Sequence, residues 1–67
     1  MILVGIGANL IAPDGSAPID TCRRAAIALD SMAGFRLVGL SRWFATKPIP
    51  ASDQPDYVNG VASMVAM

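Results

Sequence analysis

The chain has 67 residues, of which 54% are hydrophobic, and its five basic and five acidic residues cancel to a net charge of zero. A chain of this length forms at most one small domain, and its apolar fraction is well above that of a disordered chain. The balanced and scattered charges give no electrostatic footprint for nucleic acid or for an anionic membrane. Neither is expected as a partner.

Residues 2–7 are predicted to form the first strand. Apolar side chains occupy both of its faces, which is typical of a strand at the centre of a sheet. The segment carries no basic residue, and glycines, an asparagine and a proline soon interrupt its apolar run. It therefore matches neither a signal peptide nor a membrane span, and the expected location is cytoplasmic. Residues 8–17 are expected to form a loop, because turn-forming residues dominate them.

A helix is predicted over residues 17–33. Ser16 or Ala17 is expected as the N-cap, and Pro18 falls in the first turn, where its missing N–H is harmless. Gly34 is expected to end the helix. Spacings of three and four residues predict one apolar stripe, formed by Ile19, Cys22, Ala26, Leu29 and Met32.

Two further strands are predicted, over residues 35–45 and from Tyr57 onward. Arginines interrupt one face of the second strand, which favours a position near the sheet edge. Residues 46–56, which connect the two strands, are expected to form a loop, because their three prolines exclude regular strand hydrogen bonding there. The element order is β-α-β-β, an α+β class with a helix on a mostly antiparallel sheet. It is an incomplete ferredoxin-like βαββαβ pattern that lacks one helix and one strand. Alternation places Val38, Leu40 and Phe44 on one face of the second strand, and Phe35, Leu37 and Trp43 on the other.

Most residues with chemical potential are interpreted structurally. Residues 5–10 resemble a phosphate-binding glycine loop only weakly, because a leucine takes the third glycine position. Asp53 and Asp56 lie among turn residues and suit loop closure better than a metal site. Cys22 has no cysteine partner and no histidine to activate it, so a packing role is expected. Surface or core roles are likewise expected for Arg23, Arg24, Trp43 and Phe44.

Tyr57 and Asn59 are the exception, because they open a strand directly after the proline-rich loop. Their spacing of two puts both side chains on one face. An aromatic ring offers a stacking surface, and an amide offers a donor pair and an acceptor for the edge of a ring. A stiff loop loses little entropy when it closes over a ligand. The combination predicts a site for a planar heterocycle, although the same residues also suit a purely structural role.

Two stretches carry a family resemblance. Residues 6–10, Ile-Gly-Ala-Asn-Leu, are similar to Ile-Gly-Ser-Asn-Leu in 6-hydroxymethyl-7,8-dihydropterin pyrophosphokinases. Residues 41–48, with Ser, Phe, Thr and Pro at matching positions, and residues 53–59, Asp-Gln-Pro-Asp-Tyr-Val-Asn, resemble the second signature of that family. The resemblance runs through essentially all 67 residues and covers only the N-terminal part of the family's single domain. It implies a ferredoxin-like fold.

The resemblance implies an enzyme of folate biosynthesis that transfers diphosphate from ATP to the hydroxymethyl group of a pterin and releases AMP. ATP and Mg²⁺ are the implied cofactors, with their ligands beyond the position of Met67. No catalytic residue and no metal ligand is expected within this chain, so the isolated chain is expected to be inactive. The pterin-binding residues implied by position are Gly7, Asn9, Thr46, Pro48, Ile49, Tyr57 and Asn59.

Some positions depart from the family pattern, and rival interpretations stay open. Ala8 stands in place of a serine, Phe44 in place of a tyrosine and Gly60 in place of an alanine, which leaves the loop packing undefined. One rival is a small non-enzymatic module that binds a pterin or a protein. Another is a truncated reading frame whose product does not fold. Residues 58–67 are apolar on both faces, so edge-to-edge association with a partner strand is also expected there.

Overall fold

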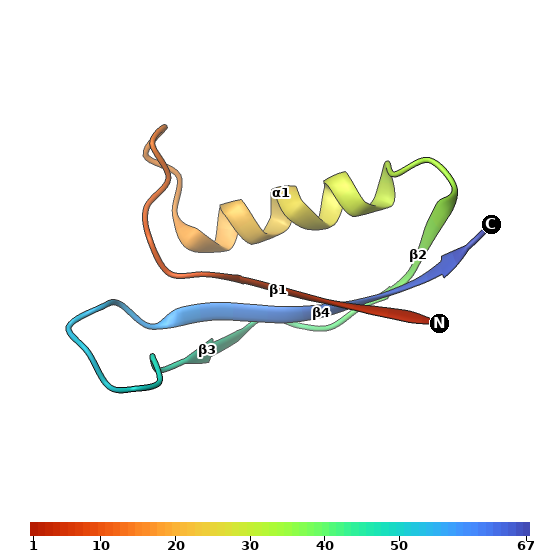
Figure 1. Ribbon diagram of the computed structural model, residues 1–67. Coiled ribbons are helices and arrows are strands. Elements are labelled where there is room, and N and C mark those ends of the chain that lie inside the picture. The colour runs from red at the N-terminus through yellow and green to blue at the C-terminus, as the bar shows by residue number, and fades with distance from the viewer.

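The computed structural model describes all 67 residues. Its elements, in chain order, are β1 (Ile2–Ala8), α1 (Pro18–Asp30), β2 (Phe35–Leu40), β3 (Phe44–Thr46) and β4 (Tyr57–Ala66). The helix lies across one face of a four-stranded antiparallel sheet, and the opposite face is uncovered (Figure 1). This is the α+β arrangement predicted from the sequence, and it is consistent with part of a ferredoxin-like fold. The structure contains no helix of the length and apolarity that crossing a membrane would require.

The strand β4 forms the centre of the sheet. It pairs with β1 on one side and with β2 and β3 on the other. The prediction that residues 2–7 form a central strand is wrong, because β1 has a neighbour on one side only. Its apolar residues on the uncovered face, such as Leu3 at 68% exposure, are left unburied. Both sides of β4 are paired within the chain over most of its length, and the expected edge association through residues 58–67 stays a prediction.

The single strand predicted over residues 35–45 is divided in the structure. The register against β4 shifts between Leu37 and Gly39, which marks a bulge. A bulge adds one residue to its strand and reverses the alternation of side chains beyond it. Leu40 therefore lies opposite Ala62, on the same face as Leu37, and the predicted face of Leu40 is wrong.

Three residues, Ser41, Arg42 and Trp43, separate β2 from β3. The Ser41 hydroxyl accepts a hydrogen bond from the Val61 N–H at 2.8 Å, and the Ser41 N–H donates to the Val61 carbonyl at 2.9 Å. The side chain thereby takes a place that backbone would fill in a regular ladder. The Trp43 ring lies over Gly60, where an added Cβ would approach the ring to 2.6 Å. The small residue at this position makes room for the indole.

The helix begins as predicted and ends earlier than predicted. Ala17 is the N-cap, without a side-chain cap, and Pro18 occupies the first turn as expected. The helix ends at Asp30 rather than near residue 33, and the Ser31 hydroxyl donates back to the Ile27 carbonyl at 3.0 Å. Such local hydrogen bonds compete with helix continuation. Gly34, with φ at +84°, then provides the left-handed turn into β2.

The hydrophobic core between α1 and the sheet is thin. Its buried apolar side chains are Cys22, Ala26, Ala62 and Met64. Cys22 is fully buried and its Sγ donates to the Val58 carbonyl at 3.6 Å, which confirms a packing role; burial raises the pKa of the thiol. The predicted apolar stripe is correct along the helix and wrong at Met32, which lies past the helix end and is 44% exposed.

Candidate functional site

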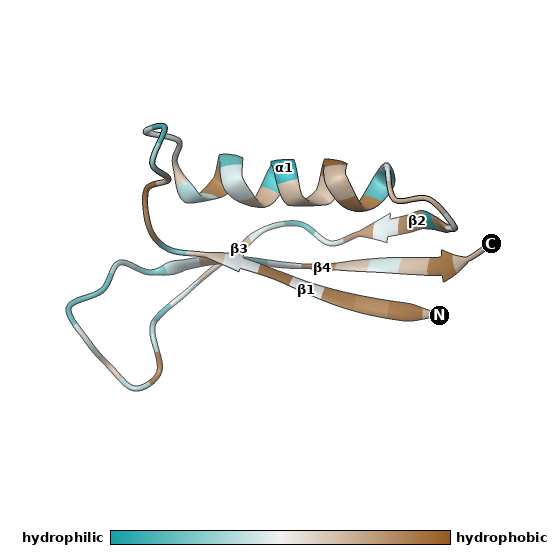
Figure 2. Cartoon of the chain, turned by 45° about the horizontal axis from the view of Figure 1, so that its top comes forward, coloured by the Kyte–Doolittle hydropathy of each residue, from teal (hydrophilic) through white to brown (hydrophobic).

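Residues from three strands meet on the uncovered face of the sheet, at the end where β4 begins. Gly7 of β1 and Phe44 of β3 both lie opposite Asn59 of β4, and Thr46 lies opposite Tyr57. Directly opposed residues of antiparallel strands share a face. These side chains therefore lie close together on one face of the sheet, beside the loop of residues 47–56. Figure 2 shows that this end of the sheet is more hydrophilic than the end that holds both termini.

The Asn59 amide is held on two sides. Its Nδ2 donates to the Thr46 hydroxyl. Its Oδ1 lies over Gly7, where an added Cβ would approach that oxygen to 2.6 Å. Glycine is thus required at this position for the amide to lie as it does. The Oδ1 has no hydrogen-bond donor among the contacts of the chain, so it is free to accept one from a ligand.

Aromatic side chains flank this amide. Tyr57 is half-buried next to Thr46. Phe44 is 45% exposed, and the Arg42 guanidinium lies 5.2 Å from the centre of its ring, within cation–π range. The prediction of a core role is wrong for Phe44, because β3 turns it onto the uncovered face. The spacing of Phe44 and Thr46 repeats that of Tyr57 and Asn59, a signal by which sequence reasoning could have grouped all four.

Asn9 is placed differently from the other predicted ligand residues. It is only 8% exposed, and its Nδ2 donates to the Gln54 side-chain oxygen at 3.0 Å and to the Pro55 carbonyl at 3.2 Å. Through these two hydrogen bonds, the amide nitrogen holds the loop against the residue that follows β1. Gln54, to which sequence reasoning assigned no role, is its partner. Asn9 acts in this structure as a positioning residue for the loop.

The loop of residues 47–56 extends past the end of the sheet and away from α1 (Figures 1 and 2). Pro48 is half-buried, whereas Ile49 is 97% exposed. These two predicted ligand residues do not join the group formed by Gly7, Thr46 and Asn59. The loop stands open in this conformation.

The acidic side chains of the chain do not gather into one cluster. No three His, Cys, Asp or Glu side chains gather closely enough to hold a metal ion. Asp14 contacts Arg24 at 3.1 Å and Asp20 contacts Arg23 at 3.6 Å, so these carboxylates already face cations.

Comparison with known proteins gives one relative. Over 61 residues, 91% of this chain, the sequence is 33% identical to the 2-amino-4-hydroxy-6-hydroxymethyldihydropteridine pyrophosphokinase of Haemophilus influenzae. The matched region is 35% of that protein, so the chain spans about a third of the relative's length. No family model matches the chain, and no solved structure matches it. The chain is thus similar to part of a pyrophosphokinase.

Proposed function

We propose that this chain carries the pterin-binding half of a hydroxymethyldihydropterin pyrophosphokinase site. The observation that carries the proposal is the Asn59 amide, held between Thr46 and Gly7 with its oxygen free. It lies beside Tyr57 in a sequence similar to such an enzyme. A fixed amide on paired strands is preorganised, so little entropy is lost when a rigid ligand binds.

The chemistry of a pterin suits this group of side chains. Its ring edge presents donors and acceptors in one plane, and an amide can match one of each. Its flat face can stack on an aromatic ring. In the proposed complex, Asn59 pairs with the ring edge and Tyr57 provides the stacking surface. The loop of residues 47–56, anchored by Asn9, closes over the ligand and brings Pro48 and Ile49 to it.

The role proposed for this chain is to bind and orient the pterin, not to transfer the diphosphate. Diphosphate transfer depends on positioning and on neutralising charge with Mg²⁺ and cationic side chains. The structure shows no cluster of three His, Cys, Asp or Glu side chains, and no step of the transfer is assigned to the residues of this chain. With ATP, Mg²⁺ and hydroxymethyldihydropterin, the isolated chain is expected to release no AMP above background, and AMP release above it would contradict this proposal.

Tyr57 gives the sharpest test of the binding site. The 67-residue chain is titrated with 6-hydroxymethylpterin while the fluorescence of the pterin is followed. Replacing Tyr57 with Ala removes the stacked ring and should weaken binding by roughly 1–3 kcal/mol, by analogy with stacked bases. Tyr57→Phe retains the ring and should bind like the parent chain. Equal binding by Tyr57→Ala, at unchanged stability to urea, would remove this residue from the site.

A non-enzymatic pterin-binding module is a second candidate, because the group formed by Thr46, Tyr57 and Asn59 would only need to hold a planar ligand. Pterin binding alone separates the two candidates poorly. The mass of the native product in its own cell separates them better, by immunoblot followed by intact mass spectrometry. A product well above 7.0 kDa favours the complete pyrophosphokinase, whereas a product of 7.0 kDa favours the binding module.

A further inference from the structure

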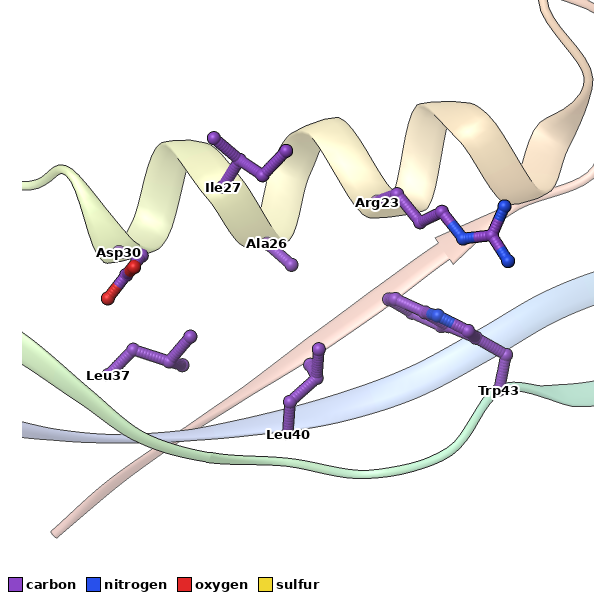
Figure 3. A pocket seen from close by; sticks show the side chains of 7 residues that line it. All are labelled: Arg23, Ala26, Ile27, Asp30, Leu37, Leu40 and Trp43. Atoms are coloured by element: carbon purple, nitrogen blue, oxygen red, sulfur yellow. The ribbon is translucent and has the colours of Figure 1, made fainter.

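The side of α1 that overhangs β2 carries an open groove, on the opposite face of the sheet from the candidate pterin site. A cavity of about 430 Å³ lies between the helix and the sheet, with Ala26 and Ile27 above it and Leu37 and Leu40 below. Figure 3 shows Arg23 and Trp43 at one end of this cavity and Asp30 at the other. Ile27 is 67% exposed and Leu40 is 45% exposed. The groove is thus lined by solvent-exposed apolar side chains and has a charged residue at each end.

The charges along this helix face are self-complementary. Arg23 and Asp30 are seven residues apart, which is about two helical turns, and Ala26 and Ile27 lie midway between them. A two-fold axis passing between Ala26 and Ile27 would set two copies of α1 antiparallel. Each Arg23 would then face the Asp30 of the other copy, and each Ile27 would face Ala26. A symmetric interface requires a patch that matches itself in this way.

We propose that this groove is the interface of a symmetric dimer, in which α1 of a second copy packs antiparallel to α1. Ile27 of each copy enters the cavity of the other, where the exposed Leu40 offers an apolar contact. The ion pair between Arg23 and Asp20 is loose, at 3.6 Å with both side chains more than half exposed, so Arg23 is free to turn toward the second copy. The zero net charge of the chain adds no repulsion between copies.

Charge reversal tests this interface directly. Sedimentation velocity is run on the full 67-residue chain from about 10 μM to about 1 mM, a range that reveals dimers with micromolar to millimolar Kd. The parent chain is expected to shift from 7.0 kDa toward twice that mass. Arg23→Asp and Asp30→Arg each place like charges opposite one another twice, and each should raise Kd about tenfold or more. Arg36→Asp, which reverses an exposed charge on the other face of the sheet, should leave Kd unchanged.

Mixing the two single variants separates loss of contact from loss of folding. In a dimer of one Arg23→Asp copy with one Asp30→Arg copy, both cross-contacts again join opposite charges. The mixture should therefore recover the dimer that each variant alone has lost. A parent chain that stays at 7.0 kDa throughout the range would overturn the proposal, even if an apolar fluorescent dye binds the groove. A dimer that persists in both single variants would also overturn it. Neither outcome depends on pterin binding, so this proposal and the proposed function can fail separately.

Discussion

Replacing Gly7 with Ala should damage the candidate site while leaving the fold intact. A Cβ at this position would lie 2.6 Å from Asn59 Oδ1, closer than real atoms approach, and 3.7 Å from the Asn59 Cγ. The nearest obstacle is the far end of a side chain, so the amide moves and the backbone does not need to. The movement pulls the amide away from Thr46 and from the position proposed to meet the ring edge.

Gly7→Ala should change both the free energy of unfolding and the affinity for pterin. Losing the hydrogen bond to Thr46 should cost about 0.5–1.5 kcal/mol of folding free energy. Replacing a glycine lowers the conformational entropy of the unfolded chain, which stabilises the fold by about 0.4–1 kcal/mol. The net change in the free energy of unfolding should therefore stay within about 1 kcal/mol. Pterin affinity should fall about tenfold or more, because the ring edge loses its amide partner.

Gly5→Ala is the matched control for this substitution. Gly5 lies in the same strand and opposite Val61, on the same face as Gly7, and no heavy atom lies within 4 Å of an added Cβ. Urea unfolding and a fluorescence titration with 6-hydroxymethylpterin are measured on both variants and on the parent chain. If Gly7→Ala bound the pterin as tightly as Gly5→Ala, the proposed role of the Asn59 amide would be refuted.

Three other substitutions test the loop anchor, the core and the pH dependence. Asn9→Ala deletes both hydrogen bonds to the loop and should cost about 1–3 kcal/mol in urea unfolding, with faster proteolytic cleavage within residues 47–56; unchanged cleavage would argue against the anchor. Met64→Ala should cost about 2–5 kcal/mol, enough to abolish a cooperative unfolding transition by circular dichroism in so thin a core, whereas Met67→Ala, at 80% exposure, should change little. The pKa of Asp14 is lowered, chiefly by the hydroxyl and N–H of a neighbouring serine and further by an arginine. The stability that Asp14 contributes is therefore present above about pH 4, its unfolded pKa, and is lost as the pH falls through the lowered folded pKa. Asp14→Asn should flatten the fall of the urea midpoint below about pH 4, and an unchanged profile would contradict this assignment.

Local patterns predicted the element types well and the arrangement of strands less well. The strand predicted from Tyr57 onward is confirmed as β4, and its Ala62 and Met64 are buried on the face under α1. The position of β1 could not be read in the same way. Apolar residues on both faces usually indicate burial on both, but the uncovered face of this sheet leaves Leu3 exposed.

The break in the predicted second strand depends on contacts that local sequence does not reveal. Ser41 bonds to the backbone of Val61, twenty residues away, and the bulge before it reverses the face of Leu40. Alternation of apolar residues alone gives no sign of such a bulge. The candidate site shows the same limit, because the partner of Asn9 lies 45 residues away. The placement of Tyr57 and Asn59 on one face of their strand was predictable, because it depends only on their spacing of two residues.

We propose above that a pterin binds to the uncovered face of the sheet through the Asn59 amide held between β1 and β3. Mapping the binding site by NMR tests it most directly, using amide spectra of the isotope-labelled chain recorded with increasing 6-hydroxymethylpterin. We expect the largest shift changes on Gly7, Thr46, Tyr57 and Asn59, including the side-chain amide of Asn59. Changes confined to the groove beside α1, or no changes at saturating pterin, would contradict it.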